Sequence, residues 1–136
     1  MLNWLSRNKK QGISRKKKQS YEVSIFLGSL GSESKELFFE RDLLYIIGLF
    51  QEEQRSKYSD SGWIPVRVSP MTIICGTSYM ENGWQISAIN YPRMAATTGE
   101  IESFMERLTI RLMEKFNQKR VTLVSPKGTV LYKDES

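Results

Sequence analysis

One segment of the chain, residues 97–116, is compatible with only one kind of secondary structure. Large apolar residues recur along it at intervals of three and four positions, at Ile101, Phe104, Met105, Leu108, Leu112 and Phe116. This spacing predicts an α-helix with one apolar face. Thr97 and Glu100 precede the stripe in the order of a capping box, in which each side chain bonds the backbone N–H of the other. Such a helix is stable only when its apolar face packs on another element, so a matching sheet or helix must exist.

Strand patterns near both ends of the chain supply that partner. Apolar and polar residues alternate from Tyr21 to Leu27, which predicts a strand. Near the C-terminus, two β-rich segments, residues 121–124 and 129–132, flank the sequence Ser-Pro-Lys-Gly. Pro126 suits the turn between them, because its fixed φ matches the second position of a type I or II turn. The sequence therefore predicts a hairpin that closes the domain.

Three further strand-like runs, residues 63–68, 71–79 and 84–91, lie in the middle of the chain. Pro65 cannot donate to a β-ladder, which places its strand at an edge or a start. Asn82-Gly83 separates the last two runs and predicts a tight hairpin turn, since type I′ turns need positive φ at both central residues. Cys75, the single cysteine, lies in an apolar run and is expected to be buried.

The segment from about residue 34 to residue 56 favours a helix by its length and polar end. A short strand at residues 37–39 is expected to precede that helix. Its middle, residues 43–50, is an eight-residue run that is apolar on every side. A helix with this pattern needs cover on two faces, by the sheet and by either another helix or a partner subunit. Residues 57–62 are predicted to be an accessible loop by their composition.

The order of these patterns predicts an α+β fold, in which a mainly antiparallel sheet is packed by two helices. The chain has 136 residues, a length that suits one domain with a buried core. We expect two parts, a disordered basic N-terminal arm with an apolar tip over residues 1–20 and a single α+β domain over residues 21–136.

The positive charge of the chain is concentrated in that arm. Residues 1–20 hold seven of the 20 basic residues and no acidic one, which leaves 13 basic and 15 acidic residues in the rest. Such a block stays disordered until it meets an anionic partner, which could be nucleic acid, a membrane or an acidic protein. Apolar residues beside the charges favour a membrane surface. The residues predicted to bind are Leu2, Trp4, Leu5, Arg7, Lys9, Lys10, Arg15, Lys16, Lys17 and Lys18.

The composition argues against catalysis. The chain has no histidine, so it lacks the one side chain that titrates unperturbed near pH 7. Its acidic pairs, such as Glu52-Glu53, are adjacent in sequence and point apart on a helix. The Gly-Ser-Leu-Gly-Ser segment at residues 28–32 lacks the lysine of a phosphate loop. The sequence therefore predicts a protein that is not an enzyme, with no catalytic residue, cofactor, metal site or small-molecule substrate.

The layout resembles that of the matrix proteins of rhabdoviruses, especially the vesiculovirus-like type. The likeness rests on the order of elements along most of the chain, namely residues 21–27 leading into 42–50, the stretch 61–78, and residues 104–107 leading through 119–120 into the 124–132 hairpin. The chain is shorter than typical members and its four isolated prolines form neither a PPxY nor a P[TS]AP motif. Use of host budding factors is therefore not implied.

The resemblance implies a viral matrix protein that binds anionic membrane lipid and the viral nucleocapsid, self-associates, and condenses the ribonucleoprotein during assembly and budding. In that role the arm residues would contact lipid or nucleocapsid. The expected locations are the virion, the host cytoplasm and the inner face of the plasma membrane, with the nucleus as a further one.

A second hypothesis is a small phage or bacterial nucleic-acid-binding or regulatory protein. Its basic tail would make nonspecific phosphate contacts, and its binding would weaken steeply with salt.

Overall fold

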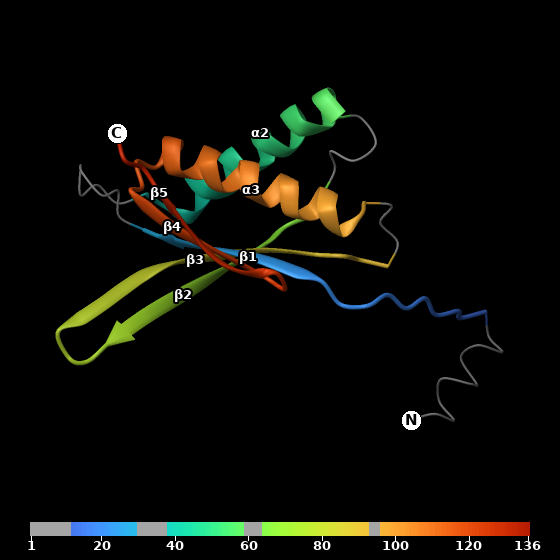
Figure 1. Cartoon of the computed structure of the whole chain (residues 1–136), viewed down its shortest axis with the longest axis horizontal. Coiled ribbons are helices and arrows are strands. Elements are labelled where there is room, and N and C mark those ends of the chain that lie inside the picture. The colour runs from blue at the N-terminus through green and yellow to red at the C-terminus, as the bar shows by residue number, and fades with distance from the viewer. Residues whose placement is uncertain (1–11, 30–37, 59–63, 93–95) are drawn as a thin grey trace.

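The computed structural model describes residues 12–29, 38–58, 64–92 and 96–136. The elements in chain order are β1 (Glu22–Gly28), α2 (Glu40–Tyr58), β2 (Arg67–Cys75), β3 (Tyr79–Ile89), α3 (Thr98–Lys115), β4 (Arg120–Ser125) and β5 (Gly128–Lys133). The strands form one antiparallel sheet in the order β2-β3-β1-β4-β5, and both helices lie on the same side of it (Figure 1). This arrangement confirms the predicted α+β class.

The core lies between that side of the sheet and the two helices. Strand β1 is central, with Ile25 opposite Ile86 of β3 and Leu123 of β4. Helix α3 contributes the stripe predicted from its sequence, and Ile101, Phe104, Met105, Leu108 and Leu112 are fully buried. The predicted capping box is present: the Glu100 backbone N–H donates to Thr97 Oγ1 at 3.1 Å, and the Thr97 N–H donates to Glu100 Oε1 at 3.0 Å. The closing hairpin of β4 and β5 is also confirmed.

The turn of the central hairpin is not where the sequence placed it. Strands β2 and β3 are joined at residues 76–78, where Gly76 has a φ of +72°. Asn82 and Gly83 lie inside β3, and Gly83 faces Gly28 of β1. A Cβ atom on Gly83 would stand 2.2 Å from the carbonyl oxygen of Leu27. Gly83 is therefore needed where β3 approaches β1 closely. A glycine inside a strand can indicate such a close approach as well as a turn.

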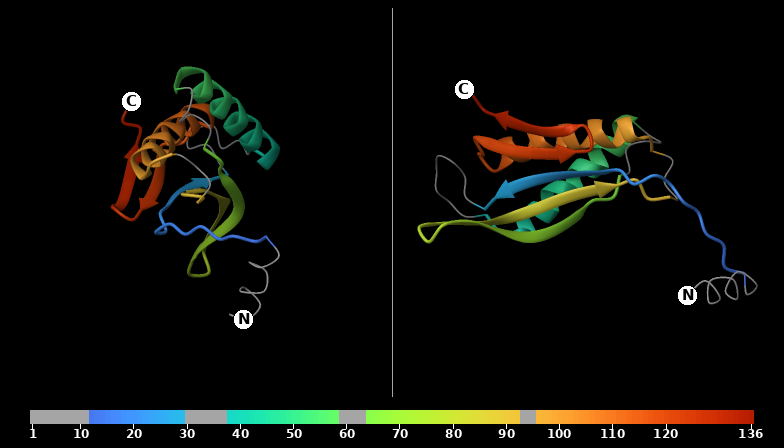
Figure 2. Two further views of the ribbon diagram at one scale, coloured as in Figure 1. Left: turned by 90° about the vertical axis from the view of Figure 1, so that its right-hand side faces the viewer. Right: turned by 60° about the horizontal axis from the view of Figure 1, so that its bottom comes forward.

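The β2–β3 hairpin extends past the region that the helices cover (Figures 1 and 2). Cys75 is exposed there, so its predicted burial is wrong. Ile74 and Met80 beside it are 65% and 68% exposed. Strand β2 begins only at Arg67 and runs through Pro70, which an edge strand tolerates because one of its sides bonds no neighbour.

Helix α2 begins at Glu40, directly after the residues of the predicted short strand, and extends to Tyr58 into the predicted loop. Residues 30–37 and 59–63, where the rest of those predictions fall, lie outside the described residues. Phe38 and Phe39 are not in a strand. The Phe38 ring instead stacks on Phe116 with centroids 4.0 Å apart, which fastens the start of α2 to the end of α3.

The described part of the arm, residues 12–20, forms no helix or strand. Arg15, Lys16 and Lys17 are exposed and Lys18 is half-buried. The other residues predicted to bind lie outside the described residues, namely Leu2, Trp4, Leu5, Arg7, Lys9 and Lys10. The binding role given to all ten stays a prediction. Within the described ranges, neither helix is long and apolar enough to cross a membrane.

Candidate functional site

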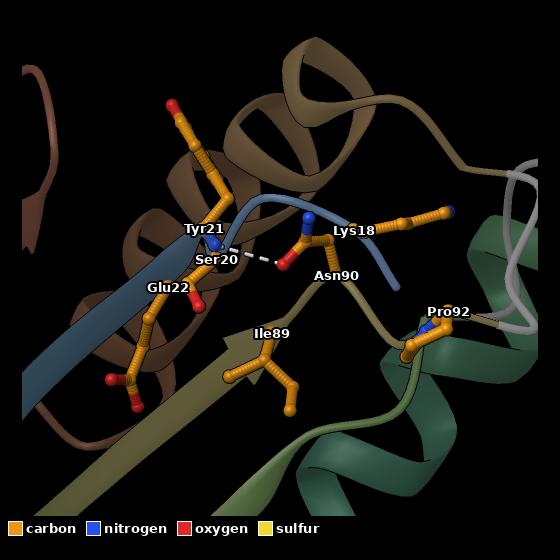
Figure 3. A pocket seen from close by; sticks show the side chains of 7 residues that line it. All are labelled: Lys18, Ser20, Tyr21, Glu22, Ile89, Asn90 and Pro92. Carbon is orange, nitrogen blue, oxygen red and sulfur yellow. Dashed lines mark hydrogen bonds between the residues drawn. The ribbon is translucent and has the colours of Figure 1, made fainter. Parts of the chain in front are cut away.

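A cavity of about 280 Å³ lies at the end of the sheet where the chain enters β1 and leaves β3. Its lining combines charged, polar and apolar groups, as small-molecule sites do, and its volume is just below the usual range for such sites. The lining residues, shown in Figure 3, are Lys18, Ser20, Tyr21, Glu22, Ile89, Asn90 and Pro92.

Asn90 holds the two chain segments of this cavity together. Its Oδ1 accepts a hydrogen bond from the Tyr21 backbone N–H at 2.8 Å, and its Nδ2 donates to the Gln19 carbonyl at 2.6 Å. The Asn90 backbone N–H also donates to the Tyr21 carbonyl at 3.1 Å. The pairing of β1 with β3 thus continues past the end of both strands, and this continuation shapes the cavity wall.

The cavity presents charges of both signs beside apolar surface. The Glu22 carboxylate lies 3.1 Å from the Arg67 guanidinium, in a pair that is largely exposed. Lys18 lines the same cavity from the arm, while Ile89 and Pro92 supply apolar contact (Figure 3). In Figure 3 the Glu22 carboxylate and the Lys18 ammonium group extend in different directions from the lining, and the carboxylate already pairs with Arg67.

A network of hydrogen bonds lies directly behind the cavity. The Tyr21 side chain points away from Asn90 (Figure 3), and its hydroxyl donates to Glu102 Oε2 on α3. Ser125 Oγ donates to Glu102 Oε1 at 2.9 Å, and Lys127 Nζ lies 3.3 Å from Oε2. One carboxylate, whose side chain is 12% exposed, thereby joins β1, α3 and the last hairpin.

The network sets the protonation of its two central groups. Burial, reinforced by the bond to the Glu102 carboxylate, raises the pKa of Tyr21 to about 12. The hydrogen bond from Tyr21, against the opposing effect of burial, holds the pKa of Glu102 below its usual value. At neutral pH the pair is therefore a neutral phenol and a carboxylate. This arrangement positions the cavity wall and stabilises nearby cations, but neither group exchanges a proton readily near pH 7.

Two other hollows offer less. One of about 410 Å³ at the start of α2 is lined, among described residues, by Phe39, Glu40 and Arg41. The other, of about 210 Å³, lies between the helices, where Arg111 pairs with Glu53 at 2.7 Å. The charges of Arg111 and Glu53 neutralise each other in this ion pair. The hydrogen bond from Arg111 lowers the pKa of the Glu53 carboxyl, which keeps it ionised as the partner of Arg111. The cavity at Asn90 remains the best candidate.

Sequence reasoning found little of this site. Of the four predicted binding residues that the structure describes, Arg15, Lys16, Lys17 and Lys18, only Lys18 lines the cavity. Tyr21 was assigned to a strand face, and Glu102 is a polar residue of a helix whose partners lie far away in sequence. A buried tyrosine–carboxylate pair leaves no local pattern, because 81 positions separate the two residues. Asn90 falls inside the predicted strand run 84–91 and gives no signal of its own, whereas β3 ends one residue before it, at Ile89.

Solved structures with the same fold are those of a phage enzyme. One is a phage SAM lyase in complex with S-methyl-5'-thioadenosine, which is 15% identical and has a TM-score of 0.60; the match covers 90% of this chain and 96% of that one. The same enzyme type in its apo state is 12% identical with a TM-score of 0.62, over 91% of this chain and 98% of that one. At this identity the likeness establishes the fold. No family model matches the sequence. No curated protein matches it either.

These neighbours overturn the resemblance to rhabdovirus matrix proteins. With it go the implied functions, which were binding of anionic membrane lipid and viral nucleocapsid, matrix-like self-association, and a role in assembly and budding. The neighbours fit the nucleic-acid-binding alternative only weakly. The resemblance to matrix proteins rested only on the order of strands and helices along the chain. That order is a weak guide to function, because an antiparallel sheet covered by two helices occurs in proteins of unrelated function.

The predictions that the chain is not an enzyme and binds no small molecule are contradicted by the same neighbours, one of which holds a small nucleoside. The argument from missing histidine was too broad. It excludes reactions that need a group titrating near neutral pH, but it does not exclude a reaction whose leaving group departs without a proton.

Proposed function

We propose that this chain is an enzyme that cleaves S-adenosylmethionine, with the cavity at Asn90 as part of its substrate site. The observation that carries the proposal is the match of nearly the whole chain to a SAM lyase fold, over 96% of the length of the neighbour that holds S-methyl-5'-thioadenosine. A match of this extent leaves no large part of the neighbour without a counterpart.

The substrate chemistry fits a chain without histidine. S-Adenosylmethionine carries a sulfonium, an ammonium and a carboxylate. When the bond from sulfur to the methionine γ-carbon breaks, its electron pair goes to the sulfur and S-methyl-5'-thioadenosine leaves as a neutral thioether. That leaving group needs no proton. As this bond breaks, either the substrate's own carboxylate oxygen attacks the γ-carbon and closes a lactone, or a base such as the Glu22 carboxylate takes a proton from the β-carbon and leaves an unsaturated amino acid.

The protein would contribute mainly position and electrostatics to such a reaction. In the lactone route the sulfonium and carboxylate charges neutralise each other while the ammonium charge remains, and such a step is helped by a site that aligns the breaking bond and replaces water with fixed charges. In the cavity, Lys18 is placed to attract the substrate carboxylate, and Glu22 to attract the ammonium or sulfonium group. The hydrogen bond between Tyr21 and Glu102 fixes the chain segment that carries Lys18 and Glu22.

A direct test is to incubate the purified chain with S-adenosylmethionine and follow S-methyl-5'-thioadenosine by liquid chromatography and mass spectrometry. We expect time-dependent formation of S-methyl-5'-thioadenosine in equal amount to the four-carbon product, whose identity distinguishes the lactone from the unsaturated acid. If no turnover occurs and calorimetry detects no binding of either nucleoside, the proposed function is wrong.

A pair of neighbouring lysines tests the location of the site. Lys18 lines the cavity, whereas Lys17 is exposed beside it and belongs to the same segment. We expect Lys18→Gln to raise KM for S-adenosylmethionine about 10-fold, which corresponds to the loss of one charge-assisted contact. Lys17→Gln should leave KM within about twofold of wild type. Equal effects of the two substitutions would place the substrate elsewhere.

A further inference from the structure

The side-chain amide of Asn90 takes the place of backbone groups in the ladder between β1 and β3. Glu22 pairs with Ile89, so the next pair in this register is Tyr21 with Asn90. The Asn90 backbone N–H donates to the Tyr21 carbonyl, as an antiparallel ladder requires. The Tyr21 N–H, however, donates to Asn90 Oδ1 at 2.8 Å (Figure 3). A side-chain oxygen therefore does the work of a backbone carbonyl at this point.

Pro92 explains why the side chain of Asn90 makes one bond more. In the same register Gln19, two positions before Tyr21, falls opposite Pro92. Proline has no N–H, so it cannot donate to the Gln19 carbonyl. Asn90 Nδ2 donates to that carbonyl instead, at 2.6 Å. Asn90 thus carries the register of β1 past the end of the strand, back to Gln19.

The arm holds four cations in a row, so its register decides which of them reaches the cavity. Residues 15–18 read Arg-Lys-Lys-Lys. Side chains of an extended chain alternate between two faces, and a slip by one residue exchanges the faces. Lys18, Ser20 and Glu22 lie at alternate positions, and all three line the cavity. A slip by one residue would bring Lys17 to the place of Lys18, so charge alone does not fix the register.

The burial of the arm agrees with a fixed position of Lys18. Among residues 12–20, Lys18 is half-buried and the other eight are exposed. Lys18 directly precedes Gln19, whose carbonyl is bound by Asn90. Ordering a lysine side chain costs conformational entropy, so its position requires a backbone that is held next to it. Asn90 provides that hold.

We propose that Asn90 is a positioning residue that sets the register of the arm, so that Lys18 and not Lys17 is the cation that lines the cavity. It acts through the Gln19 carbonyl and the Tyr21 N–H. At this side-chain length asparagine combines an acceptor with a donor, whereas an aspartate only accepts. The contact of Lys18 with a substrate carboxylate rests on the proposed function, but the register of the arm does not.

Limited digestion of the full chain by trypsin tests the register without any substrate. Trypsin cleaves after lysine and arginine in segments that open locally, and mass spectrometry at low extent of digestion gives the rate at each bond. Cleavage after Arg15, in the exposed part of the arm, is the internal reference. Asn90→Asp keeps the acceptor for the Tyr21 N–H but turns an oxygen toward the Gln19 carbonyl, and Asn90→Ala removes both bonds. We expect each variant to speed cleavage after Lys18 at least 10-fold relative to the reference.

Asn82→Asp is the matched control, because it makes the same change on the same strand. Asn82 is exposed, and its Oδ1 accepts from Thr72 Oγ1 at 2.9 Å, a bond that an aspartate can keep. Cleavage after Lys18 in this variant should stay within about twofold of wild type. Circular dichroism spectra check that all variants keep their fold.

A double-mutant cycle with S-adenosylmethionine tests whether Asn90 acts through Lys18. We expect Asn90→Ala to raise KM about fivefold and to leave kcat within about twofold, since a misplaced lysine weakens binding of the substrate carboxylate. In wild type, the KM effect of Lys18→Gln should be about 10 times that of Lys17→Gln. In the Asn90→Ala background this ratio should fall to about 1, because neither lysine is then selected. A variant that is only less stable would lose kcat and keep the ratio.

The two experiments separate the possible failures. Faster cleavage after Lys18 in both Asn90 variants, but not in Asn82→Asp, supports the register even if S-adenosylmethionine is not turned over and the proposed function is wrong. Unchanged cleavage after Lys18 in both Asn90 variants overturns the proposal. A KM ratio that stays near 10 in the Asn90→Ala background also overturns it, because Lys18 would then find its place without Asn90.

Discussion

Alanine at Gly83 should disrupt the centre of the sheet, although the substitution adds only one methyl group. Its Cβ would lie 2.2 Å from the Leu27 carbonyl oxygen and 3.0 Å from the Gly28 Cα, both of which are backbone atoms. To lengthen the contact between this Cβ and the Leu27 oxygen from 2.2 Å to at least 3.0 Å, β1 and β3 would have to separate by roughly 1 Å. Strand β3 lies between β1 and β2, so it cannot move away from one without disturbing the other.

The magnitude follows from overpacking. Forcing backbone shifts of this size in a packed core costs about 1–3 kcal/mol. For a chain of this length, that free energy corresponds to a fall in melting temperature of roughly 3–11 °C. Thermal and urea unfolding followed by circular dichroism at low micromolar concentration measures both quantities.

Gly48→Ala is the matched control, because it makes the same chemical change at a site with free space. It should stabilise the isolated chain by about 0.5–1 kcal/mol through helix propensity. The two variants are therefore expected to shift in opposite directions. If Gly83→Ala unfolds at the wild-type temperature, the close approach of β1 and β3 at this point is wrong, and Asn82-Gly83 becomes a turn again.

Two further predictions concern α3 and the network behind the cavity. Thr97→Ala removes the acceptor of the Glu100 N–H and should lower the free energy of unfolding by about 1 kcal/mol, measured by urea denaturation; Thr98→Ala, one position later, is the control. Tyr21 should ionise near pH 12, later than an ordinary tyrosine, and Tyr21→Phe should remove one late step from the ultraviolet titration of the six tyrosines. Because the folded pKa is raised from 10.0, the stabilisation from neutral Tyr21 is complete below pH 10 and is lost as the pH rises toward 12. A Tyr21→Phe titration identical to that of the wild type would contradict the hydrogen bond to Glu102.

Local patterns predicted the elements that depend on local physics. The capping box of Thr97 and Glu100 involves groups three residues apart, and the stripe of α3 repeats at the helical period, so both are visible in the sequence. The alternation in β1 is visible for the same reason. Asn82-Gly83 misled the prediction because two causes, a tight turn and a close contact between strands, select the same residues. Only the position of Leu27 distinguishes them.

The candidate site depended on contacts that no sequence pattern encodes. Tyr21 meets Glu102 across 81 positions, and Asn90 bonds Gln19 across 71. The charge count along the chain directed attention to the arm, and the missing histidine directed it away from catalysis. Neither observation describes how side chains come together at the end of a sheet, which is where the candidate cavity at Asn90 lies.

Sequence patterns alone predicted the class of fold, the amphipathic helix with its cap, and the presence of a second, more apolar helix. These follow from periodicity, which depends on residues within a few positions of one another. The tertiary structure decided the strand order, the place of the hairpin turn, the exposure of Cys75, the Tyr21–Glu102 pair and which side of α2 remains open. Each of these is a relation between distant segments, and it exists only once the chain has brought them together.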